Sequence, residues 1–188
     1  MLRSFDSDVI ESLRGIDSEN LPVTAGGLSE LMTKCADMIL ANASLRLNRD
    51  LAADVSRSCA SAADAVIAEN PAFARAHAAA LVARADEFDA DDYVAAQATA
   101  AFEPWPLGTR LLAVERRIVL GGTLDADLDQ AVRADAARAA QSHWGRQILA
   151  GVYLRRPALR DPITAAVETR PDEDKAAFLR AVRSLTAR

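Results

Sequence analysis

Arginine and aromatic side chains are concentrated in residues 142–160, SHWGRQILAGVYLRRPALR. Arginine forms paired hydrogen bonds to carboxylates and phosphates, and arginine beside tryptophan or tyrosine is typical of binding hot spots. We therefore predict a partner-binding surface here, formed by Trp144, Arg146, Tyr153, Arg155 and Arg156. A second interpretation stays open, because Trp144, Ile148 and Val152 are spaced as one helix face and would then belong to the core.

Catalytic chemistry finds little support in the sequence. It lacks the phosphate-binding P-loop, the glycine motif of dinucleotide-binding proteins, the H-E-x-x-H zinc motif and the G-x-S-x-G nucleophile motif. The two histidines, His77 and His143, are far apart in the sequence. His77 lies on an apolar helix face, which favours a core or groove histidine over a ligand or a base. We therefore predict no catalytic residue and no cofactor.

Two acidic segments could attract a cation. Residues 125–130, DADLDQ, begin like a calcium-binding loop, but an EF-hand needs Gly at the sixth position and Glu at the twelfth. Gln130 and Ala136 occupy those positions. Acidic residues in the first turn of a helix are stabilised by the helix dipole without any metal. Residues 86–92, DEFDADD, are interpreted as a solvated turn. We predict no metal site.

Cys35 and Cys59 are the two cysteines of the chain, and they lie at similar distances along the sequence on either side of Asn48. If Asn48 marks the corner of an antiparallel helix pair, the two thiols lie at about the same level and could touch. We expect free buried cysteines, because we expect a reducing compartment. The first residues, MLRSFDSDVIESLRG, lack the apolar segment of a signal peptide, and no apolar run is long enough to span a membrane. The sequence therefore predicts a cytoplasmic protein without a membrane span.

Helices must position these residues. Apolar side chains recur at helical spacing along nearly the whole chain, and no convincing strand pattern is present. The predicted fold class is all-α, an array of antiparallel helix pairs. Prolines, glycines and capping residues set the boundaries, with Ser29, Asn48 and Asp161 as expected N-caps. The expected helices cover residues 6–14, 30 onward, 49–69, 71–85, 93–102 and 106–120. They continue with one that the segment TLDADLD (123–129) starts, one over 143–155, a short one from 161 and a last one after 171.

One apolar face is especially regular. Its members follow each other at spacings of three or four positions: Leu51, Val55, Cys59, Ala62 and Val66. We predict that this face forms a buried seam against Leu31, Cys35 and Met38 of the preceding helix.

Pro104 and Pro106 bracket Trp105 and predict a sharp corner between two helices. The ring of Trp105 is expected to cover the end of the neighbouring helix pair. The alternative is that Trp105 anchors a binding partner, and we include it among the candidate binding residues for that reason.

Charge is distributed unevenly. The net charge is −5, which argues against general nucleic-acid binding. Residues 1–104 carry 8 basic and 17 acidic side chains, whereas residues 105–188 carry 14 basic and 10 acidic ones. This asymmetry predicts that an acidic protein or peptide, or a second copy of the chain, contacts the basic half. Arginine greatly outnumbers lysine, which occurs only at positions 34 and 175, and this composition is typical of a GC-rich bacterial genome.

A loop rich in proline, glycine and asparagine, IDSENLPVTAGG, occupies residues 16–27. It predicts a boundary between an N-terminal arm, residues 1–27, and a single all-helical domain, residues 28–188.

Pro71 and Pro104 are 33 positions apart, and between them lie the helical segment ARAHAAAL (74–81), the acidic turn DEFDADDY (86–93) and the segment TAAFEP (99–104). This pattern resembles a tetratricopeptide repeat, which has a period of about 34 residues. In the resemblance, which covers residues 50–120, the three segments are similar to the first helix of a repeat, its turn and its closing segment. The resemblance implies right-handed stacking of helix pairs and a concave surface that binds a partner.

These observations favour a non-enzymatic adaptor or scaffold that binds a protein. Two alternatives stay open. One is a small-ligand-binding or enzymatic helical bundle that uses His77 or the arginine cluster in a pocket between helices. The other is a helical transcriptional regulator, which the net charge and the lack of a clear helix-turn-helix disfavour.

Overall fold

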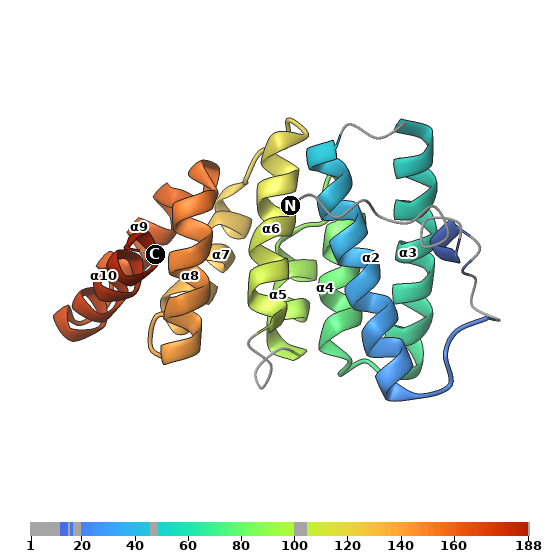
Figure 1. The fold of residues 1–188 in the computed structure, drawn as a ribbon, viewed down its shortest axis with the longest axis horizontal. Helices are drawn as coiled ribbons and strands as arrows, with labels where there is room; N and C mark the ends of the chain where they lie inside the picture. The colour runs from blue at the N-terminus through green and yellow to red at the C-terminus, as the bar shows by residue number, and fades with distance from the viewer. Residues whose placement is uncertain (1–11, 15, 17–19, 46–48, 100–104, 188) are drawn as a thin grey trace. The chain divides into compact units, whose positions relative to one another are not determined.

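The regular structure of the described residues is helical. The computed structural model describes residues 12–14, 16, 20–45, 49–99 and 105–187. Figure 1 labels its elements in chain order: α2 (Ala25–Leu45), α3 (Arg49–Glu69), α4 (Ala74–Ala83), α5 (Ala90–Thr99), α6 (Trp105–Val119), α7 (Ala126–Ala139), α8 (His143–Arg155), α9 (Arg160–Glu168) and α10 (Asp172–Thr186), with a short 3-10 turn, η1, over Pro157–Leu159. No strand occurs among these residues, so the predicted all-α class is confirmed.

The chain divides into two compact units, residues 1–84 and 85–188. The first unit contains α2, α3 and α4, and the second contains α5 to α10. This division places the acidic segment 86–92 in the second unit, which carries 14 basic and 16 acidic residues. The basic half predicted from residue 105 onward is therefore part of a unit whose charges nearly balance.

The first unit is built from α2, α3 and α4, which pack pairwise against one another. Cys35 and Met38 on α2 and Val55, Cys59 and Val66 on α3 are buried. The burial predicted for these five residues is therefore confirmed. Leu31, the other predicted α2 member of the seam, is only partly buried, and the side chain of Leu51 lies outside the described residues. Much of the core consists of alanine, which allows close approach of the helix backbones and adds little apolar bulk.

Thr24, rather than Ser29, begins the second expected helix. The Thr24 hydroxyl oxygen accepts a hydrogen bond from the Gly27 backbone N–H at 3.1 Å. Ser29 lies inside α2, where its carbonyl accepts from the Thr33 hydroxyl at 2.8 Å. The predicted N-cap was wrong because a threonine can cap a helix as a serine does, so Thr24 was an equally good candidate. The two glycines that follow Thr24 disfavour a helix, but they do not prevent α2 from starting there.

The expectation of free cysteines was also wrong. Cys35 and Cys59 form a disulfide between α2 and α3, with their Cα atoms 5.7 Å apart. The estimate that both thiols lie at the same level was correct, because the two helices form an antiparallel pair. The expectation of free thiols was drawn from an expected reducing compartment and not from the geometry of the two helices.

The first residues described in the chain also contact α3. Residues 12–14 are helical, and Leu13 is buried. The Arg14 guanidinium lies 3.1 Å from the Asp54 carboxylate, and the Ser58 hydroxyl donates to the Arg14 carbonyl at 3.2 Å. The rest of the helix expected over residues 6–14 and the Asn48 cap lie outside the described residues.

The second unit consists of two rows of helices. In one row α5 packs against α7 and α7 against α9, and in the other α6 packs against α8 and α8 against α10. Figure 1 shows α6 and α8 side by side. The core between the rows includes Leu111, Leu128, Leu149 and Ile163, all fully buried.

Local caps fix the ends of these helices. Gly121 has φ of 90°, and it ends α6 in a Schellman motif, with Gly121 N–H donating to Ile118 O and Gly122 N–H to Arg117 O. The predicted glycine stop is confirmed. The Asp125 carboxylate caps α7 by accepting from Leu128 N–H at 2.8 Å. Asp161 lies within the first turn of α9 and is not its N-cap, which corrects that prediction.

None of the helices in the described ranges is long and apolar enough to span a membrane.

Candidate functional site

Trp144 is the most exposed of the Phe, Tyr and Trp side chains described in the second unit. It lies in the first turn of α8 with 68% of its surface exposed, whereas Phe88, Tyr93 and Phe178 are buried. The preceding Ser142 caps the helix, because its hydroxyl oxygen accepts from the Gly145 backbone N–H at 2.9 Å. This cap fixes the backbone that presents the indole. The interpretation of Trp144 as a core residue is therefore wrong, although Val152 on the same spacing is buried.

His143 shares this exposed first turn. Its ring meets the Trp144 ring edge to face, with the centroids 6.4 Å apart and the planes at 74°. The pair forms an exposed aromatic surface at the N-terminal end of α8. Such a surface is suited to an apolar group of a partner, and an indole N–H can add a hydrogen bond.

Arg146 points into the fold rather than to solvent. Its Nη1 donates to the Ala140 carbonyl at 2.9 Å and lies 3.6 Å from the Asp174 carboxylate. Arg170 also contacts Asp174, at 3.2 Å. Only 19% of the Arg146 side chain is exposed. These contacts tie the end of α7, α8 and α10 together, and they leave Arg146 little freedom to bind another molecule.

Tyr153 is half-buried near the other end of α8. Its ring meets Phe178 of α10 edge to face at 5.8 Å, and the Arg160 guanidinium lies 5.8 Å from the ring centroid. Arg160 also donates from Nε to the Tyr153 carbonyl at 3.1 Å. The arginine therefore satisfies a carbonyl in the last turn of α8, where a cation is stabilised by the helix dipole.

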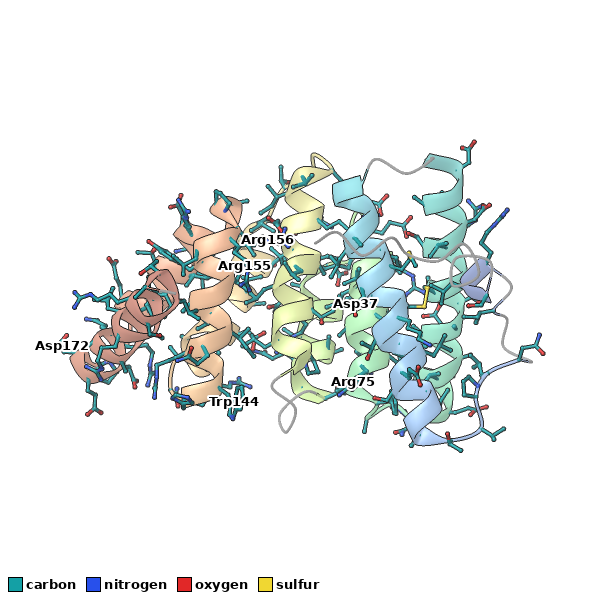
Figure 2. The ribbon with its side chains drawn as sticks, in the orientation of Figure 1. Asp37, Arg75, Trp144, Arg155, Arg156 and Asp172 are labelled. Atoms are coloured by element: carbon teal, nitrogen blue, oxygen red, sulfur yellow. A yellow bond between two sulfur atoms is a disulfide. The ribbon has the colours of Figure 1, made fainter. Side chains whose placement is uncertain are left out.

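Arg155 and Arg156 lie at the C-terminal end of α8, opposite Trp144 (Figure 2). Arg155 is exposed. Its guanidinium covers Gly151, because a Cβ added to Gly151 would lie 2.9 Å from Arg155 Nη2. Arg156 forms an ion pair with Glu115 of α6 at 3.2 Å. Burial raises the pKa of the Glu115 carboxyl above its usual value, and the Arg156 charge acts in the opposite direction.

The residues predicted for one binding surface are thus separated. Trp144 and Arg155 are exposed at the two ends of α8, Arg146 and Arg156 are engaged in ion pairs, and Tyr153 is half-buried. Trp105 is the first residue of α6, but its side chain lies outside the described residues, as does Pro104.

A buried polar network lies between α5, α6 and α7. The Tyr93 hydroxyl donates to Asp135 Oδ2 at 3.0 Å. Arg110 donates to the same carboxylate from Nε at 3.0 Å and from Nη2 at 2.9 and 3.1 Å. All three side chains are nearly inaccessible to solvent. Sequence reasoning missed this network.

A signal for the network was present in the sequence. Asp135 lies between Val132 and Ala136 on the apolar face of its helix, and Arg110 precedes Leu111 on another. A charged side chain within an apolar stripe needs a buried partner, and opposite charges on two such stripes can form an ion pair with each other.

The network keeps Tyr93 protonated. Burial raises the pKa of the phenol well above its usual value near 10, and the negative charge of Asp135 raises it further, while Arg110 opposes the rise. The phenol therefore acts as a hydrogen-bond donor and not as a base at neutral pH. Two buried nitrogens, Arg110 Nη1 and Gln97 Nε2, have no hydrogen-bond partner among the described residues. The clear role of the network is to hold three helices in register.

The candidate ligand residues have local roles. His77 Nε2 lies 2.9 Å from the Pro71 carbonyl, in the turn before α4. Asp89 and Asp92 accept from each other's backbone N–H groups, at 3.0 and 3.3 Å, and so start α5. Asp129 pairs with Arg133 at 2.7 Å. Within the part of the chain that the structure describes, no group of three or more His, Cys, Asp and Glu side chains could hold a metal ion.

No family model, curated protein or solved structure matches this chain.

Proposed function

We propose that this protein is a non-enzymatic interaction module of the helical-repeat type, which binds a segment of another protein along α8. The observation that carries the proposal is the exposed Trp144 at the start of a helix that belongs to an ordered row. Tryptophan is enriched in binding hot spots, where its ring is buried against a partner.

The repeat character is supported by the packing of alternate helices. α5, α7 and α9 form one row and begin at residues 90, 126 and 160. These intervals are close to the period of a tetratricopeptide repeat, about 34 residues. We therefore propose α5–α6, α7–α8 and α9–α10 as the repeated pairs. The pair suggested by the sequence corresponds to α4 and α5, which belong to different compact units.

The binding surface that we propose is a stripe along α8. Trp144, Ile148, Gly151 and Arg155 follow each other at spacings of four, three and four, so they share one side of the helix. The distance along the helix from the exposed Trp144 to the exposed Arg155 is about 16 Å. An extended chain covers this distance with about five residues.

The chemistry of the stripe defines the partner. Trp144 offers an apolar face, and Arg155 offers a guanidinium that binds carboxylates in a paired geometry. The best-fitting partner is a protein segment with an apolar residue about five positions from an aspartate or glutamate. Arg156 contributes less, because its charge is already paired with Glu115.

The test compares four versions of the full chain: wild type, Trp144→Ala, Arg155→Glu and Arg180→Glu. Arg180 is exposed on α10 and provides the matched charge control. Partners are recovered from source cells, purified, and measured directly by calorimetry at two salt concentrations. We expect Trp144→Ala to weaken binding by about 2 kcal/mol, as hot-spot truncations do. Arg155→Glu should weaken binding, and added salt should then strengthen the remaining binding, because it screens the new repulsion between the introduced glutamate and the acidic partner.

The control should bind like wild type. A purified partner that binds Trp144→Ala and Arg155→Glu as tightly as it binds wild type would rule out this stripe as the binding surface. Light scattering on the same four proteins tests the other occupant, a second copy of this chain. Self-association lost in Trp144→Ala would make the chain its own partner.

The catalytic alternative is less well supported. His77 is engaged with the Pro71 carbonyl, and the buried phenol of Tyr93 is held as a donor. The alternatives of a small-ligand-binding bundle and of a transcriptional regulator stay predictions.

A further inference from the structure

The disulfide between Cys35 and Cys59 uses both cysteines of the chain. Each cysteine is fully inaccessible to solvent. The bond joins the middle of α2 to the middle of α3, and 24 positions separate the two residues. The bond is therefore a covalent link across the interior of the first unit rather than a surface clip.

The core of the first unit explains why a covalent link is useful there. In one cluster formed by α2, α3 and α4, five of the seven buried residues are alanine: Ala62, Ala63, Ala76, Ala79 and Ala80. Burying alanine removes far less apolar surface from water than burying leucine or phenylalanine. A crosslink stabilises such a core by restricting the unfolded chain.

We infer that this chain is a substrate of thiol–disulfide exchange, and that the Cys35–Cys59 bond forms in an oxidising compartment before the first unit closes. In the reaction, one cysteine thiolate attacks the disulfide of a donor protein and displaces a donor thiolate. The second cysteine thiolate then attacks this mixed disulfide. The chain loses two protons and two electrons, and the donor disulfide is reduced to a dithiol.

The order of events follows from burial. An exchange partner must reach a sulfur in line with the bond that breaks, and neither sulfur is reachable in the folded unit. The exchange therefore takes place on the unfolded or partly folded chain. Once α2, α3 and α4 have packed, the same burial shields the bond from reductants.

The inference replaces the expected cytoplasmic location. Disulfides form and persist in oxidising compartments and are rare where thioredoxin and glutathione keep thiols reduced. The cytoplasmic location was expected from the lack of an apolar N-terminal segment, and free thiols were expected from that location, whereas here both sulfurs are bonded.

The first experiment counts thiols in the full chain, produced both in the reducing cytoplasm and in an oxidising compartment of the same host. A thiol reagent is applied in denaturant, without reductant. We expect two thiols per chain from the reducing compartment and none from the oxidising one. We also expect dithiothreitol to reduce the folded protein about 100-fold or more slowly than the denatured protein, because exchange needs access to a sulfur.

The second experiment measures the unfolding equilibrium with and without reductant. Loop-closure entropy for two cysteines at a sequence separation of 24 predicts a rise of about 300-fold in the unfolding constant on reduction. Hydrogen exchange of peptides from α2 and α3 locates the change. The variant Cys35→Ala/Cys59→Ala should resemble the reduced protein and should not respond to reductant.

Val55→Ala is the matched control, because Val55 is buried on the same face of α3 as Cys59. Val55→Ala should be less stable than wild type both with and without reductant, and reductant should still raise its unfolding constant by the same factor. Reduced wild type supplies the comparison if the double cysteine variant fails to fold. Two free thiols in protein from the oxidising compartment would overturn the inference. The inference would also be overturned if dithiothreitol reduced the bond equally fast in folded and denatured protein. Reduction of the bond without any loss in the free energy of unfolding would overturn it as well.

Discussion

Arg110 and Asp135 form a buried ion pair in which two nitrogens of the guanidinium contact the carboxylate at 2.9 to 3.1 Å. The pair joins α6 to α7, and the Tyr93 hydroxyl adds a contact from α5. Removing two charges from water is expensive, so the pair is tolerated because both charges and their hydrogen bonds are present together. The three side chains therefore depend on one another.

The first prediction concerns this dependence. Asp135→Leu leaves the Arg110 charge buried without its partner, so we expect a loss of about 3–5 kcal/mol in the free energy of unfolding. The double variant Arg110→Met/Asp135→Leu removes both charges and should recover most of that loss. Urea denaturation of the three proteins measures both effects.

Tyr93→Phe serves as the control, because it removes one hydrogen bond and leaves the ion pair intact. Its expected loss is about 1–2 kcal/mol. If Asp135→Leu were no more destabilising than Tyr93→Phe, the ion pair would not hold these helices together.

The second prediction concerns alkaline pH. The pKa of the Tyr93 phenol is raised in the folded protein, chiefly by burial, so the folded state holds this proton more tightly than the unfolded state. The resulting stability is present below pH ~10 and is lost as the pH rises toward the folded pKa, by up to about 1.4 kcal/mol per pH unit. Denaturation of wild type and Tyr93→Phe from pH 8 to 11 checks this. Equal slopes in the two proteins above pH 10 would contradict the assignment.

The third prediction separates stability from binding at Trp144. The side chain is largely exposed, so Trp144→Ala should change the free energy of unfolding by no more than about 0.5 kcal/mol. Thermal melts of the variant and wild type measure this. A loss of several kcal/mol would mean that the indole packs as part of the core, and the binding proposal would then lose its main support.

The fourth prediction concerns two glycines. A Cβ on Gly145 would collide with the Ala139 carbonyl group and lie 2.8 Å from the Ser142 hydroxyl, so Gly145→Ala should destabilise by about 1–3 kcal/mol. Gly26 has open space around its Cα and lies in α2, so Gly26→Ala should be neutral or stabilising by up to about 1 kcal/mol. Thermal melts that gave the two variants the same sign of change would argue against the tight turn between α7 and α8.

Helix positions could largely be predicted from the sequence, because local signals determine them. The helix at residues 143–155 was predicted with its observed bounds, since Ser142 caps one end and Pro157 follows the other. The seam of Val55, Cys59 and Val66 followed from helical spacing alone. The start of α2 was missed because several residues near Thr24 could serve as caps, and the hydrogen bond selects one.

Features that depend on long-range contacts could not be predicted in the same way. The Tyr93–Asp135 contact joins residues 42 positions apart, and helical spacing carries no information about which helices become neighbours. The candidate binding surface shows the same limit. Composition suggested one arginine cluster, but Asp174 and Glu115 pair with Arg146 and Arg156, and those acidic residues lie on other helices.

The two-row packing of the second unit has a consequence for how it folds during synthesis. Each helix meets its row neighbour after one intervening helix, as α7 does with α5 and α9 with α7. The starts of these three helices lie at residues 90, 126 and 160, so a ribosome adding about 5–20 residues per second supplies each new row neighbour within about 2–7 seconds. The nascent chain can therefore bury its apolar faces progressively, and no early helix has to wait for the C-terminus.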